Sequence, residues 1–295
     1  MDTSVKSSGQ ELLIPREKVS KRKQRSVLIE VNSRDRNTLS YPNPNEFRWL
    51  LQRPLKDIQT IQIVGGTFPT RIFNVNTGYN QFTFQEDGIR YTVTLNPGRY
   101  TMSSYAIEIG SKINNLLGLK NQYSVQISPT SDQMTITQDS GPKHPFALLF
   151  ATGDFVDLYQ GNVLLQMNSP TKQMGFLTQD YSDNGTRSIT SPYAVELNYL
   201  HNRVYLYINV ENSQDLTTIE RSAGKRDPYT IIYMDEDERA YKYFDKVTFE
   251  PTYLSSPAPV ARIRGLDISI RDEFYRLINM NGRDFTLLLE VVTLE

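Results

Sequence analysis

Residues 29–47 read IEVNSRDRNTLSYPNPNEF, and this stretch decides how the fold begins. Val27, Ile29 and Val31 are apolar and alternate with other residues, which predicts a strand with one mainly buried face. The charged residues 34–36 interrupt it, and Pro42 and Pro44 then each fix their own φ and restrict the residue before them. A second extended run follows at residues 47–51, so the stretch predicts two strands joined by a rigid, exposed connection.

Outward from this stretch, the chain continues as strand after strand. Residues 59–68 form an apolar run in which Gly65 and Gly66 favour a bulge. Alternating residues predict two hairpins, residues 79–85 with 89–95 and residues 123–128 with 133–137. Further strands are expected at residues 193–197, 203–210, 229–234, 242–251, 262–270 and 285–294, and the last two are expected to pair with each other.

Only one helix is indicated. Ser103 or Ser104 is a suitable N-cap, and Tyr105, Ile109 and Ile113 recur at helical spacing. Gly118 is expected to end this helix after about Leu117.

The chain has 295 residues, enough for one large β domain or two smaller ones. We expect a mainly β fold, an antiparallel β-sandwich with one helix, covering residues 26–295. Residues 139–188 have poor periodicity and are expected to form a large inserted region; two fused β-sandwiches are the alternative. Residues 1–25 form a basic N-terminal arm, either solvated or ordered on a neighbour.

Composition excludes several classes of protein. Lys and Arg number 32 against 33 Asp and Glu, so the net charge of −1 indicates no particular partner. There is no cysteine, which excludes disulfides and thiolate chemistry and fits folding in a reducing compartment. No apolar run approaches the length of a membrane span, and no signal-peptide core is present at the start. We therefore expect a soluble protein.

The sequence offers little catalytic chemistry. His144 and His201 are the two histidines, and neither has a nucleophile or acid beside it in sequence. Residues 235–238 are four consecutive carboxylates, but they lack the spacing of a calcium loop. We expect no enzyme, no metal site and no cofactor.

Three short motifs resemble a known family. Residues 32–36 with 41–47, residues 95–101 and residues 281–287 are similar to segments of minor capsid and vertex (penton-type) proteins of nucleocytoplasmic large DNA viruses. Asn32 stands where that family often has Asp. The resemblance implies a jelly-roll-type sandwich and a structural role in an icosahedral shell. It also implies other capsid proteins as partners, including the major capsid protein, a homo-oligomer or hetero-oligomeric shell, and a location in the virion after assembly in the host cytoplasm.

Two readings remain for the charged loop. Arg34, Asp35 and Arg36 form either a local salt-bridge loop or a contact with a neighbouring subunit. In the arm, Leu12, Leu13 and Ile14 are candidate docking residues, and Arg22 and Lys23 are candidate contacts. Nucleic acid is a less favoured partner, because no aromatic residue lies among the arm's charges. A carbohydrate- or receptor-binding β-sandwich is the alternative function, since 18 tyrosines could stack on ligands.

Overall fold

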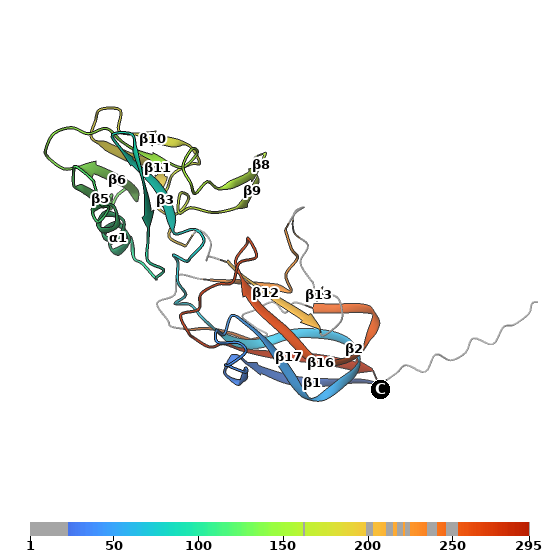
Figure 1. Ribbon diagram of the computed structural model, residues 1–295. Helices are drawn as coiled ribbons and strands as arrows, with labels where there is room; N and C mark the ends of the chain where they lie inside the picture. The colour runs from blue at the N-terminus through green and yellow to red at the C-terminus, as the bar shows by residue number, and fades with distance from the viewer. Residues whose placement is uncertain are drawn as a thin grey trace, which may run out of the picture.

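A computed structural model gives the fold, and it describes residues 23–161, 163–198, 203–210, 215–216, 221, 225–234, 241–245 and 253–294. The regular structure in this part of the chain is mainly β, with antiparallel sheets and one α-helix, as the sequence predicts. Figure 1 shows two groups of elements joined at one end. We name them the terminal unit (residues 23–72 and 203–294) and the inserted unit (residues 73–198), because each has its own hydrophobic core.

The terminal unit is one antiparallel sheet of eight strands in the order β1-β17-β2-β16-β12-β13, with β14 also paired to β12 and β15 to β2. The strands are β1 (Gln24–Asn32), β2 (Glu46–Pro69), β12 (Arg203–Val210), β13 (Asp215–Leu216), β14 (Thr230–Tyr233), β15 (Tyr241–Asp245), β16 (Tyr253–Arg271) and β17 (Thr286–Leu294). β1 and β17 run side by side along their whole length, from Gln24 opposite Leu294 to Asn32 opposite Thr286. The first and last described strands of the chain are therefore neighbours.

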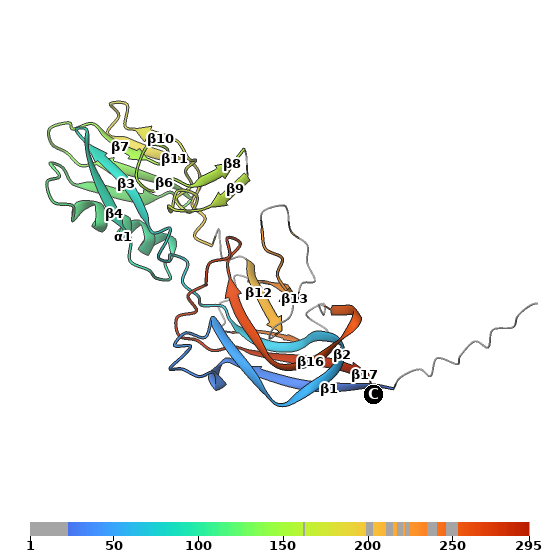
Figure 2. The same cartoon turned by 45° about the vertical axis from the view of Figure 1, so that its right-hand side comes forward.

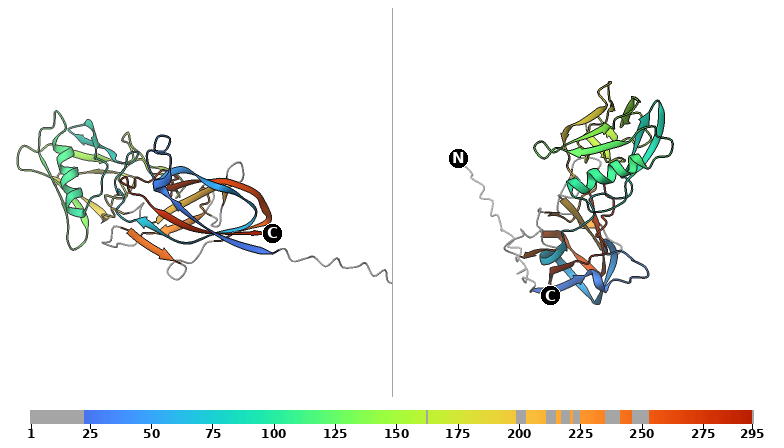
Figure 3. Two further views of the ribbon diagram at one scale, coloured as in Figure 1. Left: turned by 90° about the horizontal axis from the view of Figure 1, so that it is seen from below. Right: turned by 90° about the vertical axis from the view of Figure 1, so that its left-hand side faces the viewer.

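The sheet curls over its own core because β2 changes partners along its length. Its first half pairs with β16, and its second half pairs with β17 as well, starting at Ile58. Asp57, the residue before, has a φ of 50°, a local left-handed conformation. Figures 2 and 3 show β2 and β16 bending together, so that the sheet forms a curled half-barrel. Phe47, Phe68 and Phe285 are among the side chains buried inside it.

The inserted unit contains two small sheets, ordered β10-β7-β3-β4 and β11-β6-β5, and a β8–β9 hairpin at its margin (Figure 2). Its strands are β3 (Gln81–Glu86), β4 (Ile89–Thr94), β5 (Tyr123–Ile127), β6 (Gln133–Gln138), β7 (Phe146–Leu149), β8 (Leu158–Gln160), β9 (Val163–Gln166), β10 (Asp180–Ser182) and β11 (Ser188–Ala194). Phe84 of one sheet lies 5.0 Å from Tyr123 of the other, measured between ring centres. Both predicted hairpins are confirmed, and Asp87 and Gly88 form the first turn with positive φ.

Helix α1 (Met102–Asn114) buries the predicted face of Tyr105, Ile109 and Ile113 against this core. Its N-cap is Thr101, not Ser103 or Ser104. Thr101 and Ser104 form a reciprocal capping box, which satisfies two N–H groups at the helix start and so fixes its first turn there.

Two sequence expectations are wrong. The strands at residues 262–270 and 285–294 do not pair with each other, because β2 lies between β16 and β17. Pairing of neighbours in sequence is only a tendency, and here the long β2 supplies edges to both strands. The helix also ends at Asn114 rather than near Leu117, which is 94% exposed.

Residues 139–188 do not pack as a separate region. Phe146, Leu148, Phe150 and Phe176 belong to the same core as residues of β3, β6 and α1. The bulge expected at the glycine pair is present, since the β2–β17 register shifts between Gly65 and Ile63. The domain boundaries of the sequence analysis stay a prediction, and β1 begins at Gln24, inside the predicted arm.

Candidate functional site

The side chain of Arg36 fixes the charged loop of residues 33–36 by hydrogen bonds to backbone carbonyls. Ser33–Asp35 form a short 3-10 turn, and the Asn32 side chain accepts a hydrogen bond from the Arg34 N–H at 3.0 Å. The guanidinium of Arg36 donates to the carbonyl oxygens of Ser33, Tyr41 and Pro42 at 2.7, 2.9 and 3.1 Å. These three bonds tie the start of the loop to its proline-rich end.

Asp284, from the C-terminal motif, completes this arrangement. Its Oδ1 accepts from Arg36 at 2.7 Å and from the Ser33 hydroxyl at 2.8 Å, and its Oδ2 lies 3.5 Å from Arg34 Nε. The backbones are joined as well, because Ser33 N–H donates to the Phe285 carbonyl at 3.0 Å and the Phe285 N–H donates to Ser33 Oγ at 2.9 Å. The first and third motifs are thus one structural site.

The loop nevertheless presents an outward face. The Arg34 side chain is 72% exposed whereas that of Arg36 is 10% exposed. Asp35 is exposed, and Leu39 at the loop tip is 96% exposed. Arg36 therefore acts within the chain, and Arg34, Asp35 and Leu39 are available to a partner. We call these three residues the loop face.

The second motif is fixed to the chain segment that enters the inserted unit. The Asn74 side chain donates to the Tyr100 carbonyl and accepts from the Tyr100 N–H, both at 2.9 Å. The backbones of Val75 and Gly98 exchange two hydrogen bonds beside it. A Cβ at Gly98 would lie 3.0 Å from the Tyr100 ring, so the small residue suits this close approach.

The three motifs converge where the two units meet. A hollow of about 300 Å³ is lined by residues of each motif, namely Asn43, Pro44 and Asn45, then Pro97, then Gly282, together with Asn76, Thr77, Leu277, Asn279 and Met280. Asn45 also donates to the Ile278 carbonyl at 2.8 Å. We call this region the motif junction.

A half-buried arginine joins the units next to the junction. Arg276 of the terminal unit donates to the Met167 carbonyl at 2.6 Å, and its guanidinium lies 4.4 Å from the centre of the Tyr79 ring. Gln173, which is fully buried, donates to the carbonyls of Asn74 and Leu197 at 2.6 and 2.9 Å. Gln173 therefore ties the two ends of the inserted unit to one side chain.

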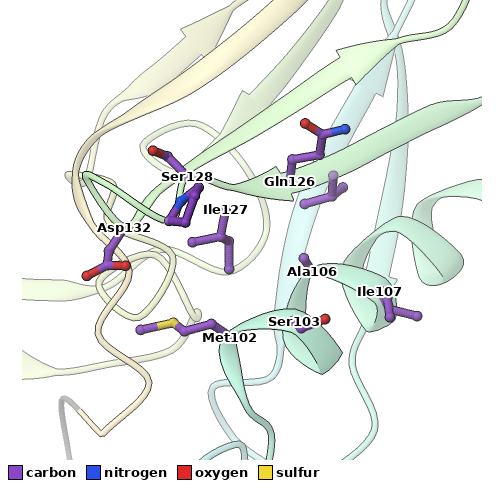
Figure 4. Close-up of a pocket in the computed structure, with 10 residues that line it drawn as sticks. Met102, Ser103, Ala106, Ile107, Gln126, Ile127, Ser128 and Asp132 are labelled. Atoms are coloured by element: carbon purple, nitrogen blue, oxygen red, sulfur yellow. The ribbon is translucent and has the colours of Figure 1, made fainter.

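A surface hollow of the inserted unit has no side chains that suggest catalysis. It measures about 440 Å³ and lies between the start of α1 and the β5–β6 turn (Figure 4). Its lining consists of Met102, Ser103, Ala106, Ile107, Val125, Gln126, Ile127, Ser128, Pro129 and Asp132. This lining includes no aromatic ring on which a sugar could stack.

One histidine acquires an acidic partner that the sequence did not show. His144 Nδ1 and Lys120 Nζ each lie 2.6 Å from Asp87 Oδ2. The hydrogen bond from Lys120 lowers the pKa of Asp87; burial opposes this shift, and the contact with His144 adds to it. His201 and residues 235–238 lie outside the described residues. Within the described part of the chain, no group of three or more His, Cys, Asp or Glu is placed to hold a metal ion.

The predicted contacts of the arm stay predictions. Leu12, Leu13, Ile14 and Arg22 lie outside the described residues, and Lys23 is exposed just before β1. Sequence reasoning did not identify Asp284 as a partner of the charged loop, nor Leu39 as an exposed residue of that loop. Asp284 lay within a quoted motif, but only the fold brings it beside Arg36. Among the described residues, no helix is long and apolar enough to cross a membrane.

The fold and the junction define a mainly β, two-unit protein in which the motif residues bind one another and the backbone. A model of the family of unknown function DUF5901 matches residues 19–230, and the chain belongs to that family. No curated protein matches the sequence. Among solved structures, the mavirus penton protein is similar with a TM-score of 0.46 and 11% identity, over 91% of this chain and 99% of that one.

Proposed function

We propose that the chain is a structural capsid protein of a large icosahedral DNA virus, a minor capsid or vertex component that acts through contacts between subunits. The observation that carries this proposal is the convergence of the three motifs at the motif junction. The motif residues bind other parts of the chain: Arg36 donates to the Tyr41 carbonyl, and the Tyr100 backbone pairs with the Asn74 side chain. These hydrogen bonds hold the shape of the chain, and a fixed shape is what a subunit of a shell needs.

The loop face gives the proposal its contact surface. Arg34, Asp35 and Leu39 project from a loop that Arg36 and Asp284 hold in place. A pre-ordered loop loses little conformational entropy on binding, and a charged rim around one apolar side chain is typical of an interface. The partners would be other capsid proteins, including the major capsid protein and further copies of this chain. The protein would act in the virion after assembly in the host cytoplasm.

The oligomeric state of the full-length protein tests this proposal. We expect wild-type protein to form an oligomer in sedimentation velocity experiments, and the double variant Arg34→Ala/Leu39→Ser to shift it towards monomer. The matched control is Thr130→Ala, an exposed residue of the inserted unit, which should sediment as wild type does. A wild-type protein that stays monomeric at every concentration, with no change in the double variant, would contradict the loop face as a subunit contact.

A further inference from the structure

A hollow of the terminal unit lies beside the charged loop and measures about 310 Å³. Its lining includes Asn32, Arg34, Thr67, Tyr241, Tyr243 and Asp284. The side chain of Arg34 is 72% exposed and Tyr243 is 67% exposed, so the hollow is open to a partner. Because Arg34 lines it, the hollow adjoins the loop face.

The charges at this hollow leave room for an acidic group. Arg36 donates to Asp284 at 2.7 Å, and Arg34 lies 3.5 Å from the same carboxylate. Each guanidinium carries one positive charge, and Asp284 offsets one of the two, so one positive charge is left over within the described lining. Asn32 uses its side-chain oxygen to accept the Arg34 N–H, which leaves its NH2 group as a donor. With the hydroxyl groups of the lining, these donors fit a carboxylate.

The same loop carries a carboxylate on another side. Ser33, Arg34 and Asp35 form a 3-10 turn, in which successive side chains point about 120° apart. Ser33 is fully buried, so Arg34 and Asp35 project from two different outer sides of the loop. Asp35 is exposed, and within the described part of the chain no hydrogen bond or ion pair engages its carboxylate. The loop therefore has a positive side with a hollow and a negative side that lacks a counter-ion.

We propose that Asp35 of one copy of this chain enters the hollow beside Arg34 of a second copy. A second copy is favoured because the two sides are complementary in charge and every copy carries both of them. The contact joins two different surfaces, so the same contact can repeat from each copy to the next. This inference rests on the proposed function and deepens it, since it names the two surfaces by which copies of the chain associate.

Charge reversal in the full-length protein tests the inference. Sedimentation velocity would compare the wild type with Arg34→Asp, with Asp35→Arg and with the double variant Arg34→Asp/Asp35→Arg. Each single reversal places like charges in contact, and we expect association to weaken by about tenfold or more. The double variant reverses both sides together, so its association should return towards that of the wild type. Arg53→Asp, at an exposed position of β2, is the matched control and should associate as the wild type does.

A mixture of the two single variants separates the contact from a folding defect. Alone, each variant carries the same charge on both sides of its loop and should stay mainly monomeric. In the mixture, the Asp35→Arg protein offers an arginine to the hollow that Arg34→Asp has made acidic, and the converse contact pairs Asp35 with an unchanged hollow. We expect the mixture to associate, which two misfolded proteins would not do.

Asn32→Asp tests the hollow itself. Asn32 is the N-cap of the 3-10 turn, and Asp is an equally good N-cap, so the turn should be retained. The added carboxylate offsets the positive charge that is left over in the hollow. We therefore expect weaker association with an unchanged melting temperature.

The outcomes separate the inference from the proposed function. Single reversals or Asn32→Asp protein that associate as tightly as the wild type would overturn the inference, and so would a double variant or a mixture that fails to recover association. If the chain enters virus particles but these variants behave in that way, the inference alone is overturned. If the variants behave as expected but the wild-type chain is absent from particles, the proposed function alone is overturned.

Discussion

At the residue scale, two arginines that are neighbours in sequence have opposite surroundings. Arg36 is nearly buried and donates to three carbonyls and Asp284, whereas Arg34 is mostly exposed and lies 3.5 Å from the same carboxylate. Arg36→Ala would remove the guanidinium that donates to these carbonyls and to Asp284, which would keep only the Ser33 hydroxyl and the longer contact with Arg34. We expect a loss of about 2–3 kcal/mol in unfolding free energy, measured in urea. Arg34→Ala should change it by no more than about 0.5 kcal/mol. Equal losses in the two variants would contradict the division between an inward brace and an outward face.

The contact between Asp87 and Lys120 should make the stability of the protein depend on pH in the acid range. The pKa of Asp87 is lowered by Lys120, so its folded pKa lies below its unfolded value of about 3.9. The stabilisation it provides is present above that unfolded value and is lost as the pH falls through the folded pKa. Asp87→Asn should therefore lower the melting temperature at pH 6 and reduce the further fall in melting temperature as the pH drops below about 4. The exposed Asp139→Asn is the control. If the melting temperature of Asp87→Asn fell with acid as steeply as that of the wild type, the contact of Asp87 with Lys120 would not contribute to stability.

Sequence patterns predicted single residues well where the cause is local. The buried face of α1 follows from the helical spacing of Tyr105, Ile109 and Ile113. The partnership of Arg36 with Asp284 spans 248 positions in sequence, and no periodicity encodes it. For this reason the sequence left the two readings of the charged loop open.

At the element scale, β17 is a central strand, as the alternation of its residues predicted. It lies between β1 and β2, and Leu287 and Leu289 are fully buried. The incorrect prediction was its partner, because a strand's alternation reports which face is buried and not which neighbour covers its edges. The 24-residue β2 was likewise expected as two strands, since the bend at Asp57 resembles a break in the pattern.

Phe285 tests the importance of this strand's start. Its ring lies 5.8 Å from that of Phe47 and 5.7 Å from that of Phe68, between ring centres, and 1% of the residue is exposed. Phe285→Ala should cost about 3–5 kcal/mol or give largely insoluble protein. Leu288→Ala, on the half-buried opposite face, should cost less. If urea unfolding gave the smaller loss for Phe285→Ala, the core would not depend on this aromatic cluster.

At the scale of the whole molecule, the inserted unit has the features of an independent folding unit. It has its own core, and Gln173 binds carbonyls of Asn74 and Leu197 near its two ends. We expect residues 73–198, expressed alone, to give soluble protein that melts cooperatively. The readout is near-UV circular dichroism during heating. An insoluble or non-cooperative product would favour one domain over residues 26–295, as the sequence analysis proposed.

The overall class of fold was predictable from the sequence, whereas the inserted region at residues 139–188 stays a prediction. An inserted region was predicted at residues 139–188 because the hydrophobic periodicity of these residues is poor. The second core already includes Val75, and regular hairpins follow from β3 onward. The sequence at the two ends of the inserted unit does not have the composition of a linker. Hydrogen bonds of Asn74 and Gln173 hold these ends, and only the fold reveals them.

The most direct test of the account is whether the protein is part of a virus particle. Full-length tagged chain, wild type or Arg34→Ala/Leu39→Ser, would be produced in cells that assemble particles, and the particles would be purified through a density gradient. Quantitative mass spectrometry would then compare the chain with the major capsid protein. We expect wild-type chain in a fixed ratio in the particle fraction and the double variant depleted from it. Wild-type chain that is absent from purified particles would contradict the proposed structural role.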